Sequence, residues 1–266
     1  MKLATLKNRT ADGRLVVLSN DLTMCSEVGH ITATLQAGLD DWQHVGPRLE
    51  RVASGLERGS QPTSRFHEHD AMAPLPRAYR RIDARSGLEI PAGKFDGPRD
   101  RIETPTESVS ARAGYAVILD RLDAGCSAAQ ASAAVRLVLL YADIGLPDMD
   151  GAALGSVFSP AAVTPAGLGD LFANGALTRP LSLRVEGRAV DPDMAEKPDL
   201  LQAILHAARH RPLEAGTIVT CEAGHMRAPL VIGDTLRVEM RDAAGHSIFG
   251  AIERELVRRQ SDRNAA

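Results

Sequence analysis

The sequence predicts an α+β fold, with a β-rich main domain and a small N-terminal α/β domain. Stretches typical of strands outnumber those typical of helices, and the two do not alternate in the regular order of βαβ units. The 266 residues suffice for one large core and a smaller appendage. We expect the N-terminal domain and its linker over residues 1–72 and the main domain over residues 73–266.

The N-terminal domain is expected to open with a strand, a turn and a second strand. Residues 3–6 and 15–19 are apolar, and the segment between them is rich in turn-forming residues. Two amphipathic helices should follow, with Pro47 in the first turn of the second. Residues 59–76 are rich in Gly, Pro, Ser and charge, which is typical of a linker. The helical pattern rests on apolar residues at three- and four-residue steps: Leu35, Leu39, Trp42, Val45, Leu49, Val52 and Leu56.

Local sequence signals also predict where helices and strands of the main domain begin and end. Ser127 and Gln130 have the spacing of a capping box for a short helix, and a buried strand over residues 135–141 should end at Asp143. A further helix is predicted to start near Asp199. Residues 236–240 alternate between apolar and charged, which predicts a half-buried strand. A turn over residues 242–245 should lead into its partner strand over residues 246–253.

Composition excludes several classes of function. The net charge of −3 gives no basic footprint for nucleic acid. Lysines occur only at positions 2, 7, 94 and 197, which leaves few candidates for a lysine nucleophile or Schiff base. Cys25, Cys126 and Cys221 form neither a CxxC pair nor a disulfide framework. No apolar run approaches the length of a membrane span, and no signal-peptide pattern is present, so we expect a cytoplasmic protein without membrane contact.

A further signal comes from a set of segments that follow one another in chain order. They are residues 1–6, 12–17, 65–70, 73–79, 158–165, 211–218, 233–240 and 247–252. Together these segments resemble the fumarylacetoacetate hydrolase (FAH) family. The resemblance implies an FAH-like main domain, a mixed β-roll or barrel, behind the small N-terminal domain.

The resemblance also assigns the family's metal-binding positions. Members bind a divalent cation through an Asp, a Glu-x-Glu pair and a further Asp. The matching residues here are Asp83, then Arg112 and Gly114 in place of the two glutamates, then Asp143. Two carboxylates beside a guanidinium are too few for a tight site of that kind, so we expect no metal and no cofactor. The family's catalytic His with its lid, its Ser-Lys-Pro lysine and its Gly-Ser-Gly-Thr loop also have no counterpart.

If the FAH-like fold is retained, one cup should collect the remaining polar residues. We expect Arg112 to pair with Asp143 or Asp83 in the cation's place. There it would either bind a substrate carboxylate or enolate oxygen, or merely fill an emptied site. The candidate catalytic residues are Arg112, Asp143, Glu222 and His225, with Glu222 or His225 as general acid or base. The candidate substrate-binding residues are Asp83, Tyr141 and Cys221, although Cys221 could equally be a small buried residue.

Three functions follow from the resemblance. The first is metal-independent chemistry in biosynthesis, on a β-dicarbonyl, oxo-acid or polyketide-like metabolite, by proton transfer, cyclisation or a lyase step. The second is a non-catalytic binding partner. The third is a conventional metal-dependent acylpyruvate hydrolase or decarboxylase with a rebuilt site. The family tendency also implies a homodimer that binds a small-molecule substrate.

Overall fold

The N-terminal part of the chain forms antiparallel strands with two helices packed on them. The predicted strand–turn–strand opening is confirmed, because the first two strands pair from Lys2 with Leu18 to Leu6 with Arg14. The computed structural model describes residues 1–84, 86–87, 89–90, 94–146, 153–173, 175–190 and 199–259, without the side chains of residues 153 and 223–227. The N-terminal elements are β1 (Lys2–Leu6), β2 (Arg14–Leu18), β3 (Met24–Glu27), α1 (Leu35–Asp40), α2 (Trp42–Glu57) and β4 (Ser64–Arg65).

The two predicted helices are present, but Pro47 is not in the first turn of the second. It stands at the sixth residue of α2, which begins at Trp42. A proline there cannot donate a hydrogen bond to the carbonyl four residues back. The helix nevertheless buries Val45, Leu49 and Val52 in the core, and this packing outweighs the lost bond.

A large mixed sheet runs from the N-terminal strands into the rest of the chain. Among the described residues the order of its main path is β4-β3-β2-β1-β11-β9-β8-β16-β5-β6, and β10 pairs with β9. The pairing of β1 with β11 joins the two predicted domains in one sheet, and the boundary after residue 72 stays a prediction. The further strands are β5 (Arg80–Asp83), β6 (Glu89–Ile90), β8 (Ser108–Leu119), β9 (Val135–Gly145), β10 (Ala153–Phe158), β11 (Ala162–Val163) and β16 (Thr217–Val231).

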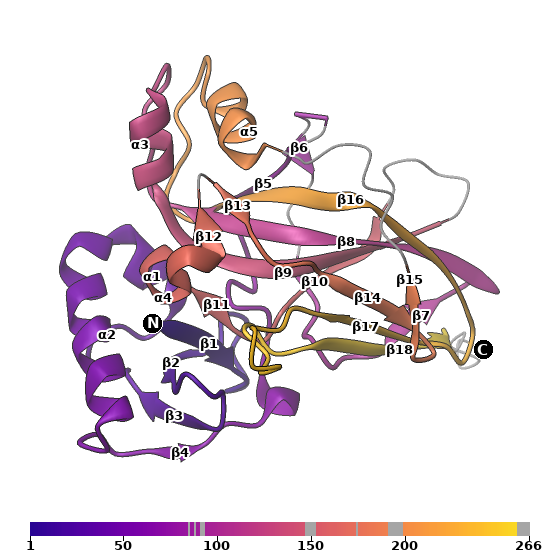
Figure 1. Cartoon of the computed structure of the whole chain (residues 1–266), viewed down its shortest axis with the longest axis horizontal. Helices are drawn as coiled ribbons and strands as arrows, with labels where there is room; N and C mark the ends of the chain where they lie inside the picture. The colour runs from indigo at the N-terminus through magenta and orange to yellow at the C-terminus, as the bar shows by residue number, and fades with distance from the viewer. Residues whose placement is uncertain are drawn as a thin grey trace, which may run out of the picture.

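A second sheet packs beside the first, in the order β15-β14-β17-β18-β7 among the described residues. Figure 1 shows β14, β17 and β18 side by side below the long strands β8, β9 and β16. Its strands are β7 (Ile102–Thr104), β14 (Ser182–Val185), β15 (Arg188–Val190), β17 (Thr235–Glu239) and β18 (Ile252–Arg258); β12 (Phe172–Ala173) and β13 (Ala176–Leu177) form a separate pair.

The predicted hairpin near the C-terminus is correct in its first strand and wrong in its second. The strand β17 pairs with β18, which begins only at Ile252, opposite Val238. The intervening chain is held as a longer connection, because the Asp242 carboxylate accepts hydrogen bonds from the backbone N–H groups of Ala244 and His246.

Short helices cover the remaining surfaces of the sheet. The capping box predicted at Ser127 is confirmed at the start of α3 (Ala128–Ala133), and Asp199 caps α5 (Leu200–Ala207) as expected. The others are η1 (Glu68–Asp70), α4 (Pro165–Leu168) and η2 (Gly169–Leu171). No helix of the described residues is long and apolar enough to cross a membrane. The α+β class is confirmed.

Each face of the long strands β8, β9 and β16 belongs to a different hydrophobic core. Side chains alternate along a strand, so Tyr115 and Val117 point into one core while Ala116 and Ile118 point into the other. Residues of α3 and α5 complete the first core, and residues of α1 and α2 complete the second. Burial on both faces explains the nearly continuous apolar run of residues 135–142.

Candidate active site

Strand register brings the predicted residues onto one face of the sheet. Arg112 of β8 lies opposite Asp143 of β9, and Gly114 lies opposite Glu222 of β16. Asp83 of β5 pairs with Thr220, two residues before Glu222. Residues two apart along a strand share a face. We call the set Arg81, Asp83, Arg112, Asp143 and Glu222 the charged cluster.

Arg81 is the member of the charged cluster that the sequence reasoning missed. Its side chain is 1% exposed, and its Nη2 donates to Asp143 Oδ2 at 2.7 Å. Its Nη1 donates to Ser156 Oγ, which in turn donates to Asp143 Oδ1 at 2.7 Å. Both oxygens of the buried carboxylate are therefore satisfied. Arg81 was detectable in principle, because it precedes Asp83 by two residues and so shares its face.

Arg112 holds a more peripheral position than predicted. Its Nη2 lies 3.9 Å from Asp143 Oδ2, beyond hydrogen-bond distance, and its side chain is 26% exposed. The predicted pairing with Asp143 is thus present, but Arg81 makes the shorter contact. Arg112 keeps donors on the accessible side of the pair, where an anion could reach them.

Tyr141 forms the floor of the charged cluster. Its ring packs near Phe158, and the Arg81 guanidinium carbon lies 5.3 Å from the ring centroid. Burial raises the pKa of the Tyr141 hydroxyl well above its usual value, and the nearby Asp143 charge adds to this, whereas Arg81 opposes it. Glu222 and Asp83 raise the same pKa. The side chain is therefore a neutral phenol within the field of three carboxylates.

Gly114 marks a close approach of β8 and β16. A Cβ atom built on Gly114 would lie 2.2 Å from the Cys221 carbonyl oxygen and 2.7 Å from Tyr141 Cε1. No side chain fits there unless the backbone of β16 moves. The position that the resemblance assigns to a glutamate is thus closed by its surroundings.

Asp83 pairs with Thr220 across β5 and β16, and Glu222 follows two residues later on the same face of β16. Glu222 is buried at 9% exposure, and Asp83 accepts a hydrogen bond from Ser86 Oγ at 2.9 Å. Thr220 Oγ1 donates to the Ile82 carbonyl at 3.2 Å and lies 3.4 Å from Arg81 Nη2. A carboxylate on the same face as a partly exposed guanidinium can act as a proton acceptor.

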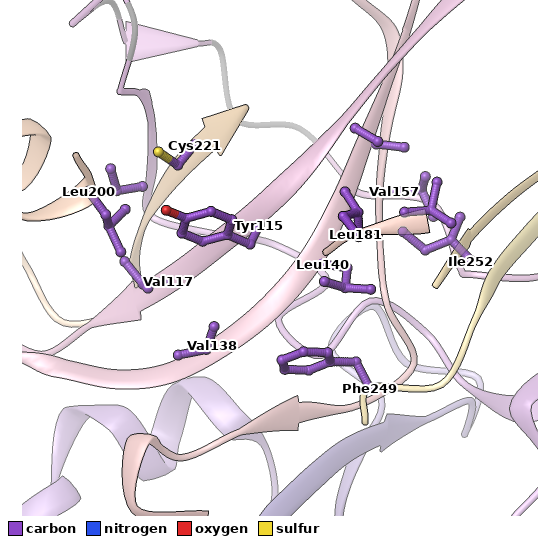
Figure 2. Packing of buried hydrophobic residues seen from close by; sticks show 14 of the residues in the cluster. Tyr115, Val117, Val138, Leu140, Val157, Leu181, Leu200, Cys221, Phe249 and Ile252 are labelled. Carbon is purple, nitrogen blue, oxygen red and sulfur yellow. The ribbon is translucent and has the colours of Figure 1, made fainter. Parts of the chain in front are cut away.

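Cys221 does not belong to the charged cluster, contrary to the prediction. It directly precedes Glu222 in β16, so its side chain points to the opposite face. There it is fully buried, and Figure 2 shows its sulfur close to the hydroxyl of Tyr115. Burial raises the pKa of the thiol to about 12, and the hydrogen bond from Tyr115 only partly opposes this. Cys221 is therefore the small buried residue of the alternative interpretation.

The side chain of His225 lies outside the described residues, so its predicted role as an acid or base stays a prediction. The remaining predicted residues, Arg112, Asp143, Glu222, Asp83 and Tyr141, are brought together.

Comparison with known proteins agrees with this architecture. The model of the fumarylacetoacetase N-terminal domain 2 family matches residues 1–77. Maleylpyruvate hydrolase from Sphingobium sp. SYK-6 aligns over 97% of this chain and 100% of its own, with a TM-score of 0.75 and 17% identity. The chain has the FAH fold. The resemblance stated from sequence is therefore confirmed at the level of the fold, at 17% sequence identity.

Other FAH-fold structures extend the comparison. The same hydrolase in complex with manganese(II) and pyruvate aligns with a TM-score of 0.71 and 17% identity, covering 98% of this chain and 100% of that one. A probable 2-hydroxyhepta-2,4-diene-1,7-dioate isomerase from Mycobacterium abscessus aligns with a TM-score of 0.66 and 14% identity, with the same coverage. No curated protein sequence matches the chain significantly. Proteins named as hydrolases and proteins named as isomerases therefore share this fold.

The described residues do not fit the divalent cation that the FAH fold implies. Asp143 is already hydrogen-bonded to Arg81 and Ser156, and Arg112 adds a second positive charge at 3.9 Å. A cation placed there would be repelled by both guanidinium groups. Within the described part of the chain, no group of three His, Cys, Asp or Glu side chains could hold a metal.

Proposed function

We propose that this FAH-fold protein binds an oxo-acid or β-dicarbonyl anion at Arg112 and acts on it without a divalent metal. The observation that carries the proposal is the buried pair of Arg81 and Asp143, with Arg112 beside it at the accessible edge. Arg81 supplies a permanent positive charge that needs no ion from solution. Arg112 then remains available for a carboxylate or enolate oxygen of the ligand.

The chemistry follows from what each side chain can do. The Glu222 carboxylate takes a proton from the carbon between two carbonyl groups, and the electron pair moves onto the carbonyl oxygen as an enolate. Arg112 stabilises that oxygen by charge-assisted hydrogen bonds. Return of the proton to the enolate oxygen completes a keto–enol tautomerisation. Enolate formation is also a common first step of cyclisation and of lyase reactions, so the final product depends on the substrate. His225 is a second candidate for the acid.

The positions of Asp143, Asp83 and Tyr141 support this scheme. Asp143 and Arg81 fix one another, so the local charge at Arg112 does not depend on a mobile partner. Asp83 pairs with Thr220, two residues before Glu222, and its carboxylate disfavours a second negative charge nearby. A negatively charged ligand is therefore better placed with its charged group at Arg112. The neutral Tyr141 ring closes the floor.

A binding and exchange experiment tests the proposal. Pyruvate and 2,4-dioxovalerate serve as probes in titration calorimetry with excess EDTA, and proton NMR in D₂O follows exchange at the acidic carbon above the uncatalysed rate. We expect EDTA-insensitive binding, about tenfold or more weakened by Arg112→Ala. Glu222→Gln should keep binding and lose exchange. The matched control is Arg121→Ala, since the Arg121 side chain is exposed and its Nε lies 4.0 Å from the exposed Asp123 carboxylate.

Two outcomes would replace the proposal. Binding or exchange that disappears with EDTA and returns with Mn²⁺ or Mg²⁺ would indicate a conventional metal-dependent site. Absence of both binding and exchange would favour a non-catalytic binding partner. The second candidate has its own support, because the Arg81–Asp143 pair satisfies the buried carboxylate without any ligand.

A further inference from the structure

A groove on the outer face of the second sheet is lined by four arginines. Its volume is about 450 Å³, within the usual range of small-molecule pockets. The lining residues come from β14, from β17 and from the segments that flank them. They include Arg179, Ser182, Arg184, Arg237, Glu239 and Arg241. All lie away from the charged cluster, which is built on β5, β8, β9 and β16.

Two of the four arginines are neutralised by carboxylates. The Glu239 carboxylate lies between Arg237 Nη2 at 3.1 Å and Arg241 Nη2 at 2.9 Å, and its side chain is 9% exposed. Arg237 also pairs with Glu253 on the neighbouring strand. Burial raises the pKa of Glu239, whereas the guanidinium groups of Arg237 and Arg241 lower it, and the net pKa shift is downward. These ion pairs hold the three side chains in place as the charged floor of the groove.

The other two arginines have no such partner. Among the described residues, neither Arg179 nor Arg184 forms an ion pair, and both side chains are exposed. Arg184 lies directly opposite Arg237 in the antiparallel register of β14 and β17. The charge of Arg237 is balanced by Glu239 and Glu253, whereas Arg184 has no ion pair among the described residues. An anion beside Arg184 would supply the missing counter-charge.

We infer that this groove binds a small phosphate-bearing molecule, with the phosphate between Arg179 and Arg184. Ser182 shares the face of Arg184 and adds a hydroxyl donor. A phosphate dianion has three terminal oxygens and accepts hydrogen bonds from two guanidiniums and a hydroxyl together. A carboxylate, in contrast, has only two oxygens, and a single bidentate arginine already occupies both of them. The remaining volume accommodates the organic part of the ligand. The inference is independent of the function proposed for the charged cluster.

Titration calorimetry with inorganic pyrophosphate and phosphate tests the inference on the full chain. We expect measurable binding that weakens with added salt, and a loss of about tenfold or more in affinity for Arg184→Gln. The matched control is Arg188→Gln, because Arg188 is an exposed arginine on the adjacent strand β15 and does not line the groove. Succinate, as the carboxylate comparator, should bind much more weakly. Arg112→Ala should leave pyrophosphate binding unchanged.

A stability measurement separates a ligand site from a structural role of Arg184. Because Arg184 is exposed and forms no ion pair among the described residues, the free Arg184→Gln variant should melt at nearly the same temperature as the wild type, while the thermal shift caused by pyrophosphate is lost. The inference is overturned if pyrophosphate does not bind, if Arg188→Gln weakens binding equally, or if succinate binds as tightly. Loss of binding in Arg112→Ala would instead place the anion at the charged cluster.

Discussion

The two faces of the strands β8, β9 and β16 differ in where they allow charge. One face carries Arg112, Asp143 and Glu222 beyond an apolar stretch that includes Ile118 and Leu139. The other face is apolar over most of the described part of that length, and there the Tyr115 hydroxyl and the Cys221 thiol form a hydrogen bond with each other. The comparison teaches that one residue step along a strand separates a charged environment from an apolar one.

The largest expected effect comes from breaking the buried ion pair on the charged face. Arg81→Met leaves Asp143 buried without its counter-charge, which should lower the free energy of unfolding by about 3–5 kcal/mol. The double variant Arg81→Met/Asp143→Leu should recover most of this loss, since an apolar pair can replace a buried salt bridge. Urea denaturation followed by circular dichroism measures both. Arg121→Met, at an exposed site, is the control, and an equal loss there would contradict the assignment.

An intermediate effect is expected at the contact between the two strands. Gly114→Ala places a methyl group against the Cys221 carbonyl and the Tyr141 ring, and overpacking of this kind costs about 1–3 kcal/mol. Gly29→Ala is the matched control, because a Cβ there meets nothing within 4 Å. Equal midpoints of denaturation for the two variants would show that β16 yields more easily than its position suggests.

The smallest effect concerns the apolar face and its thiol. In the folded protein at neutral pH, Cys126 should react with a thiol reagent, whereas Cys221 should not. The pKa of Cys221 is raised from 9.0 to about 12, so the folded state retains the proton longer than the unfolded state. The thiol's contribution to stability is therefore full below pH 9 and is lost as the pH rises towards 12.

Denaturation of the wild type and of Cys221→Ala over an alkaline pH series measures this loss. The difference between their unfolding free energies should change only above pH 9, in favour of the variant. Rapid labelling of Cys221 in the native protein at neutral pH would contradict its placement on the apolar face.

Much of the fold was predictable because its signals are local. The Ser127 capping box, the Asp199 cap and the opening strand pair each depend on residues close together in sequence. The late start of β18 was missed, because the Asp242 turn and the pairing with β17 depend on side-chain hydrogen bonds that composition does not reveal.

The charged cluster was predictable only in part. The pairing of Arg112 with Asp143 followed from the resemblance and is present in the register of β8 and β9. Arg81 was missed because its contact with Asp143 joins residues 62 positions apart on strands that do not neighbour each other. Cys221 was misplaced although the alternation of side chains along a strand already separates it from Glu222. Side-chain alternation was thus the more reliable guide wherever a strand could be recognised.

The close approach at Gly114 limits what a single substitution can do at this position. The resemblance assigns this position to a metal-binding glutamate, yet the strand β16 lies where that side chain would start. Gly114→Glu alone would therefore not create such a ligand, because the backbone of β16 or the Tyr141 ring would have to shift first. A glutamate ligand here would require at least two coupled changes.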